Sequence, residues 1–144
     1  MTDLHKVYLG LGSNLGDKHA HILQAIEKIE ELVGAVVRQS ALLDTDPWGF
    51  ESSNTFVNAC VCCMTALSPR ELLQTTQRIE REMGRTQKSR KGVYHDRIID
   101  IDILLYDDLT VDEPDLKIPH PLMWKRDFVM IPLRSIMDVA EDDD

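Results

Sequence analysis

The stretch Ile98-Ile-Asp-Ile-Asp-Ile-Leu-Leu-Tyr106 combines β-branched and aromatic residues in the pattern of a β-strand. Successive side chains of a strand point to opposite faces, so Asp100 and Asp102 would share one face while the flanking isoleucines share the other. Aspartate is unfavourable in strands, yet it occurs twice here within a strongly β-forming run. The stretch therefore predicts a strand over 98–106 with one apolar face and one face that carries two carboxylates.

The chain before this strand alternates between strand and helix patterns. Alternating and Val/Leu-rich runs predict strands over 5–12, 35–44 and 54–66, and helical spacing between capping residues predicts helices over 17–33 and 68–84. The segment from Gly10 to Gly16, with Gly12, Ser13 and Asn14, is assigned to the turn after the first strand.

After the strand at 98–106 we expect a short return strand near 109–112, a loop around His120 and a last helix over about 124–137. The resulting β-α-β-β-α-β order, with C-terminal additions, predicts a ferredoxin-like α+β plait. In that fold helices pack on one face of an antiparallel sheet. The fold hosts many activities, so it does not name the function.

Composition is that of one globular domain over 1–144 with an acidic tail at 141–144. The chain has 43% hydrophobic and 28% charged residues. No apolar run is long enough to cross a bilayer and the N-terminus lacks the pattern of a signal peptide, so we expect a cytoplasmic protein without membrane contact. The three cysteines at 60, 62 and 63 are expected to be buried thiols rather than disulfide or zinc ligands.

Charge is unevenly distributed along the chain. The net charge is −9, but the segment 85–97 carries five cations and one anion. A basic island in an acidic chain favours a compact anionic ligand over nucleic acid. A solvated loop is the alternative interpretation.

The two aspartates and the cations near them suggest a site for a metal and a polyphosphate. Mg²⁺ prefers one or two carboxylates together with phosphate oxygens, and Arg97 at the start of the strand could hold the remaining phosphate charge. Two solvent-facing aspartates on an edge strand are the alternative. Asn58, a polar residue in an apolar strand, suits the edge of a flat heterocycle, on which Trp48 and Phe128 could stack.

Five ordered motifs carry a family resemblance from Val7 to about Ile136. They are Leu11-Gly-Ser-Asn-Leu-Gly16, Asp46-Pro-Trp-Gly49 with Asn58-Ala59, Gln77-Arg-Ile-Glu80 with Gly84-Arg85, Arg97-Ile-Ile-Asp-Ile-Asp-Ile-Leu104, and Ile118-Pro-His-Pro121 with Arg126 and Phe128. Together they resemble the 6-hydroxymethyl-7,8-dihydropterin pyrophosphokinases. This resemblance implies a ferredoxin-like fold and transfer of pyrophosphate from ATP to the pterin, with release of AMP, in folate biosynthesis.

The resemblance also implies a role for individual residues. Asp100 and Asp102 would bind two Mg²⁺ ions, and the catalytic set would be completed by Arg85 and Arg97. The ATP-binding residues would be Gln77, Glu80, Arg97, Ile103, His120 and Arg126. The pterin pocket would consist of Thr45, Asp46, Trp48, Phe56, Asn58 and Phe128.

The chain departs from the family pattern in places. Gln87 occupies a position where many members carry a second loop arginine, and Lys88 or Arg90 is the candidate replacement. Asp46 and Trp48 replace a common proline and a smaller aliphatic residue. Two alternatives stay open: another Mg²⁺-dependent phosphoryl-transfer enzyme, and a non-catalytic plait domain that binds a small ligand. We expect a monomer that binds no nucleic acid.

Overall fold

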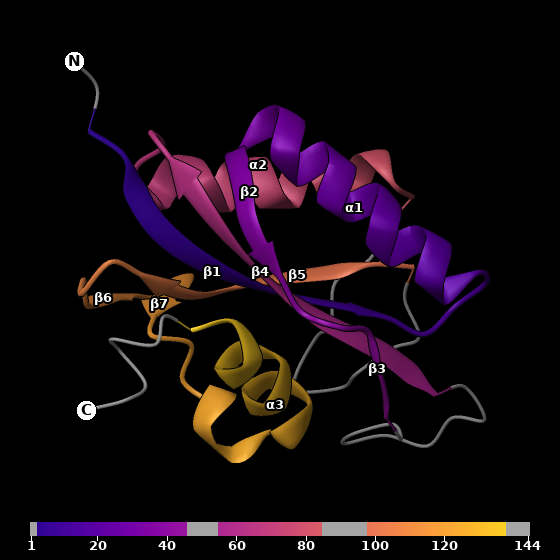
Figure 1. Cartoon of the computed structure of the whole chain (residues 1–144). Coiled ribbons are helices and arrows are strands. Elements are labelled where there is room, and N and C mark those ends of the chain that lie inside the picture. The colour runs from indigo at the N-terminus through magenta and orange to yellow at the C-terminus, as the bar shows by residue number, and fades with distance from the viewer. Residues whose placement is uncertain (1–2, 46–54, 85–97, 138–144) are drawn as a thin grey trace.

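The computed structural model describes residues 3–45, 55–84 and 98–137 (Figure 1). The strands are β1 (His5–Ser13), β2 (Gly34–Gln39), β3 (Leu43–Thr45), β4 (Phe56–Thr65), β5 (Asp100–Tyr106), β6 (Val111–Glu113) and β7 (Leu116–Ile118). The helices are α1 (Lys18–Leu32), α2 (Pro69–Glu82), the short 3₁₀ helix η1 (Met123–Lys125) and α3 (Asp127–Ile136). Several predicted features lie outside the described residues: the basic island at 85–97, the acidic tail at 141–144, Asp46, Trp48, Arg85 and Arg97.

The main sheet is antiparallel, with strand order β2-β4-β1-β5, and β3 also pairs with β4. Among the described strands, this order brings the first and last strands of the β-α-β-β-α-β core together and leaves β5 at the edge. It is the arrangement of a ferredoxin-like plait and confirms the predicted fold class.

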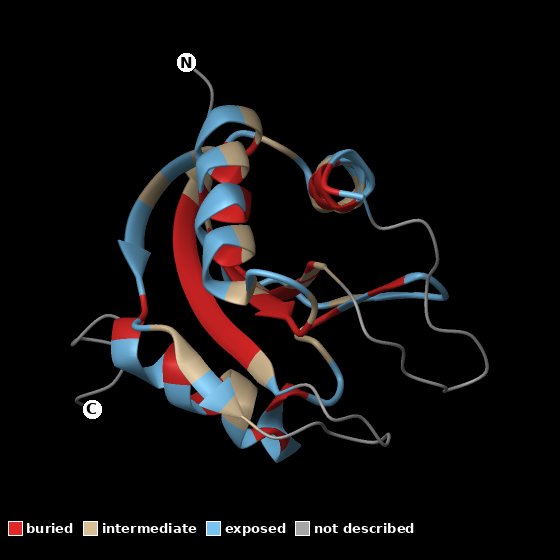
Figure 2. Ribbon diagram, turned by 90° about the vertical axis from the view of Figure 1, so that its right-hand side faces the viewer, coloured by how far each residue is buried: buried red, intermediate tan, exposed pale blue. Residues whose placement is uncertain are grey.

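Helices cover both faces of this sheet (Figure 1). α1 and α2 lie on one face, and α3 lies on the other. Figure 2 shows buried strand surface between these layers. The larger apolar cluster contains Ile22 and Ile29 of α1 and Ile79 of α2, whereas Leu133 of α3 packs with Leu104 on the opposite face.

Local capping explains where the two core helices begin. The Asp17 side chain accepts a hydrogen bond from the Ala20 N–H at the start of α1. Ser68 and Glu71 form a reciprocal capping box at the start of α2, and Pro69 occupies its first turn. Both caps confirm the predicted helix starts.

Three predicted strand assignments need correction. The strand expected over 35–44 is two strands, β2 and β3, which both pair with β4; between them the Ser40 hydroxyl, a side-chain acceptor, takes the Cys60 N–H of β4 at 2.9 Å. The return strand expected near 109–112 is β6, and it pairs with β7 in a separate two-stranded sheet. β5 begins at Asp100 rather than Ile98.

Two further corrections concern the end of the first strand and the last helix. Gly10 and Gly12, which fall both in the strand predicted over 5–12 and in the predicted turn, belong to β1, and so does Ser13, which was predicted for the turn alone. The helix expected over 124–137 is divided at Arg126, whose extended backbone (φ −121°, ψ 106°) separates η1 from α3. Within the described ranges, no helix combines the length and apolar character needed to span a membrane.

Candidate active site

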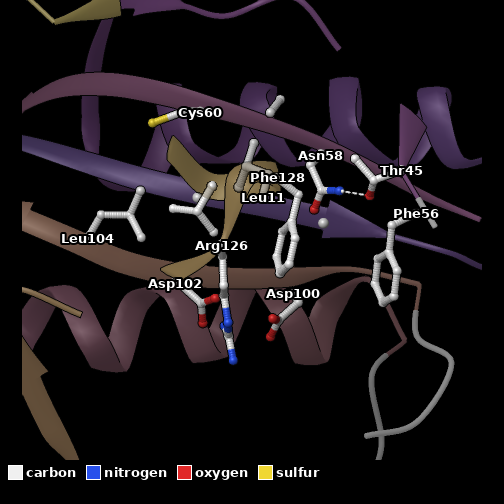
Figure 3. A pocket seen from close by; sticks show the side chains of 14 residues that line it. Leu11, Thr45, Phe56, Asn58, Cys60, Asp100, Asp102, Leu104, Arg126 and Phe128 are labelled. Carbon is white, nitrogen blue, oxygen red and sulfur yellow. Dashed lines mark hydrogen bonds between the residues drawn. The ribbon is translucent and has the colours of Figure 1, made fainter. Parts of the chain in front are cut away.

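A pocket lies over the sheet face that α3 partly covers (Figure 3). Its floor follows two cross-strand rows. In one, Gly10 of β1 stands between Asp102 and Cys60, and in the other Gly12 stands between Asp100 and Asn58. Because the central residue of each row has no side chain, the floor is open between the carboxylates of β5 and the side chains of β4.

Asp100 and Asp102 both line this pocket, as strand alternation predicts (Figure 3). Ile101, between them, is 6% exposed and packs in the apolar cluster on the opposite face. The prediction that the two carboxylates share one face is confirmed.

The same pocket contains a polar amide and two aromatic rings. The Asn58 Nδ2 donates a hydrogen bond to the Thr45 Oγ1 at 2.7 Å, which fixes how the amide is presented. Phe56 and Phe128 also line the pocket, and Figure 3 shows their rings on either side of Asn58. Two aromatic rings and an amide that line one pocket suit a flat heterocycle with hydrogen-bonding edges.

Arg126 brings positive charge to the pocket. The break between η1 and α3 places it at the N-terminal end of α3, and it is 7% exposed. Its guanidinium carbon lies 5.6 Å from the centroid of the Phe128 ring, a cation–π distance. A guanidinium beside two carboxylates can bind phosphate oxygens bidentately.

A second cavity lies on the other side of Asp102. It is lined by Asp102, Ile103 and His120 together with Leu73, Ile101, Pro114, Asp115, Leu116, Lys117 and Pro121. Asp102 is therefore a wall of both cavities.

The surroundings of His120 favour its neutral form. Burial, followed by the positive charge of Arg126, lowers the pKa of His120, and Asp100 opposes this shift. The Leu122 N–H donates to the His120 Nδ1 at 3.3 Å, so the neutral ring carries its proton on Nε2. The ring therefore presents an N–H donor at its other nitrogen.

Two of the predicted nucleotide residues lie apart from these cavities. Neither Gln77 nor Glu80 is among the lining residues of the two cavities. Glu80 is 5% exposed, and its Oε2 accepts the Ile101 N–H at 2.8 Å. Arg85, Arg97, Asp46 and Trp48 were predicted for the site and lie outside the described residues.

Several lining residues were not predicted. Leu104, Cys60 and Val129 line the first pocket, and Gly10 and Gly12 form its floor. Leu104 follows Asp102 by two residues, so strand alternation was a usable signal for it. Burial raises the pKa of the Cys60 thiol, which leaves it a neutral part of the wall. All three cysteines are buried free thiols, as predicted.

The carboxylate pair fits a hard divalent cation that is completed by its ligand. No group of three or more His, Cys, Asp or Glu side chains suited to a metal occurs within the described part of the chain. A pair of carboxylates is the protein share that Mg²⁺ commonly takes when phosphate oxygens supply the remaining ligands. The residues present therefore fit a magnesium–polyphosphate complex better than a metal held by protein alone.

Structural comparison first defines the class of protein. A crystal structure of a Plasmodium falciparum HPPK-DHPS triple mutant matches this chain with a TM-score of 0.75 at 16% identity, over 94% of this chain and 40% of that one. The chain thus spans about two fifths of the length of that structure, and the likeness concerns the fold. Fold and site together define a ferredoxin-like α+β domain with a candidate phosphate and metal site.

Sequence comparison narrows this class to a family. The family model of 7,8-dihydro-6-hydroxymethylpterin-pyrophosphokinase (HPPK) matches residues 8–138. The 2-amino-4-hydroxy-6-hydroxymethyldihydropteridine pyrophosphokinase of Porphyromonas gingivalis is 53% identical over 131 residues, which cover 90% of this chain and 89% of the relative. The enzyme of the same name from Aquifex aeolicus is 45% identical over 130 residues, covering 90% and 79%. The chain belongs to the HPPK family.

Proposed function

We propose that the chain transfers the β,γ-pyrophosphate of ATP to the hydroxymethyl group of 6-hydroxymethyl-7,8-dihydropterin, and that AMP is the other product. Asp102 carries this proposal, because it lines both the aromatic pocket and the neighbouring cavity. A carboxylate shared by two cavities is placed to act where two substrates meet. The family match and the relatives' names support the same reaction.

The aromatic pocket would bind the pterin. Its ring would lie between Phe56 and Phe128, and its polar edge would face Asn58 and Thr45. The predicted contacts of Asp46 and Trp48 belong to the same proposal. This position directs the hydroxymethyl group toward the two aspartates of β5.

The neighbouring cavity would bind the nucleotide. His120 and Ile103 line it, and Arg126 faces the junction from the other pocket. These residues, with Gln77, Glu80, Arg85 and Arg97, make up the proposed ATP and catalytic set. The basic side chains would neutralise the negative charge of the triphosphate. They would also neutralise the charge that develops on AMP, the leaving group, as its bond to the β-phosphorus breaks.

The reaction needs position and charge neutralisation more than a dedicated base. The hydroxyl oxygen attacks the β-phosphorus, the bond from that phosphorus to the bridging α,β-oxygen breaks, and the hydroxyl proton passes to solvent. Two Mg²⁺ ions bound by Asp100 and Asp102 would neutralise the triphosphate and make the hydroxyl more acidic. The protein supplies the alignment by holding both substrates against one strand.

Product analysis tests the proposal directly. The chain is mixed with ATP, Mg²⁺ and the hydroxymethyl pterin, and nucleotides are separated by chromatography. AMP that forms only when the pterin is present supports pyrophosphate transfer. ADP, or AMP without the pterin, would favour another phosphoryl-transfer enzyme. If the folded protein consumes no ATP, a binding domain is favoured.

We also propose that the chain is a single-domain, cytoplasmic monomer that binds no nucleic acid.

A further inference from the structure

A buried carboxylate of α2 holds the strand that carries the two site aspartates. Glu80 is 5% exposed, and its Oε2 accepts the backbone N–H of Ile101 at 2.8 Å in a buried setting. Burying a carboxylate is unfavourable unless hydrogen bonds replace those of water. The position of Glu80 on the core side of α2 therefore depends on partners such as this N–H.

The contact falls at the edge of the sheet. β5 pairs with β1 on one side, and in the described parts of the chain no further strand follows it in the sheet order. An edge strand leaves every second N–H without a ladder partner. Glu80 provides that partner at Ile101, the residue between Asp100 and Asp102.

The direction of the two aspartates depends on the backbone at Ile101. The Ile101 side chain is packed in the core, and its N–H is bound to Glu80, so this peptide is held at two points. Asp100 and Asp102, on either side, project from that peptide into the pocket. Any rotation of the strand edge would change the separation and aim of both carboxylates.

We propose that Glu80 is a positioning residue, which fixes β5 so that Asp100 and Asp102 bind a divalent cation together with the nucleotide. This inference rests on the proposed function, because it assumes a metal–nucleotide complex at these carboxylates. It gives Glu80 a task that needs no contact with the nucleotide. The task depends on an acceptor oxygen at the right distance and not on the negative charge.

The test compares Glu80→Ala with Glu80→Gln. The glutamine keeps a side-chain oxygen that can accept the Ile101 N–H, whereas alanine removes the acceptor. Binding of Mn²⁺ is titrated calorimetrically in the presence of a non-hydrolysable ATP analogue. Loss of a group that orients metal ligands weakens metal affinity by about 10- to 100-fold, so we expect that loss for Glu80→Ala and a much smaller one for Glu80→Gln.

A second measurement follows the anchor without metal. Amide hydrogen exchange at Ile101 is expected to be faster in Glu80→Ala than in the wild type or in Glu80→Gln. Ile79→Val, a neighbouring core change in α2, is the control for lost stability, and it should leave Mn²⁺ affinity unchanged. If Glu80→Ala does not fold, Glu80→Asp, which shortens the side chain by one methylene, replaces it and should show the same loss.

The outcomes separate this inference from the proposed function. Unchanged Mn²⁺ affinity in Glu80→Ala, or an equal loss in Ile79→Val, overturns the positioning role while the wild-type reaction still stands. A wild-type chain that binds Mn²⁺ and nucleotide but makes no AMP with the pterin overturns the proposed function alone. A wild-type chain that binds no Mn²⁺ with the nucleotide analogue overturns both.

Discussion

Replacing Gly12 with alanine would place a methyl group on the open floor of the aromatic pocket. The new Cβ would lie 3.1 Å from the Asn58 Oδ1 and 3.7 Å from the Phe56 Cδ1, and the first distance is tighter than ordinary contact. The Asn58 amide would have to turn away, although its Nδ2 is bound to the Thr45 Oγ1 at 2.7 Å. We therefore expect Gly12→Ala to weaken pterin binding, because it disturbs the Asn58 amide that would hydrogen-bond to the polar edge of the pterin.

The size of the effect follows from one displaced hydrogen-bonding group. Leaving a buried polar partner unpaired costs about 1–3 kcal/mol, which corresponds to about a 5- to 150-fold loss of affinity. Global stability should change little. Alanine lowers the conformational entropy of the unfolded chain relative to glycine. This stabilises the folded state by about 0.4–1 kcal/mol and offsets part of the cost of the close contact with Asn58.

The assay is calorimetric titration of the pterin in the presence of Mg²⁺ and a non-hydrolysable ATP analogue, with thermal unfolding in parallel. Gly10→Ala is the matched control, because the three atoms nearest to its new Cβ all belong to the Leu104 side chain, with Cδ1 at 3.4 Å. We expect Gly10→Ala to bind the pterin within about threefold of the wild type. Wild-type affinity in Gly12→Ala, or an equal loss in both variants, would refute the reasoning about the pocket floor.

Three further predictions concern the metal site, the histidine and a helix cap. Asp102→Asn should lower turnover at least about 100-fold with an unchanged circular dichroism spectrum, whereas Asp108→Asn, in the exposed turn after β5, should keep normal rates. Because the pKa of His120 is lowered in the folded chain, His120 binds a proton more tightly in the unfolded chain. The stability that the folded chain gains from a neutral His120 is therefore fully present above pH 6.5 and is lost as pH falls through the folded-state pKa. The melting temperature of the wild type should therefore fall more steeply below pH 6.5 than that of His120→Gln. Ser68→Ala should lower the free energy of unfolding in urea by about 0.5–2 kcal/mol through loss of the capping box, without changing kcat.

Patterns with a local cause were predictable from the sequence. The alternation at Asp100 and Asp102 depends only on the two-residue period of a strand, and the start of α2 at Ser68 depends only on its capping box. The family resemblance placed Thr45, Asn58 and Phe128 in one pocket, and the structure brings them together.

Features that depend on tertiary pairing were not predictable in the same way. Gly10 and Gly12 have the composition of a turn, but pairing of β1 with both β4 and β5 keeps them in an extended strand. Ser40 looks like an ordinary strand residue until its hydroxyl meets the Cys60 N–H. In each case the deciding partner lies far away in the sequence.

The position of β5 at the sheet edge explains how one carboxylate can line two cavities. A residue on a central strand has neighbouring strands on both sides, so its side chain can face only the space above or below the sheet. Asp102 has β1 on one side and, beyond the other, the second cavity with His120 and Lys117. The same edge leaves the Ile101 N–H available to Glu80. An edge strand therefore gives this domain a shared carboxylate between two cavities, and the anchor from α2 offsets the loss of a second strand partner.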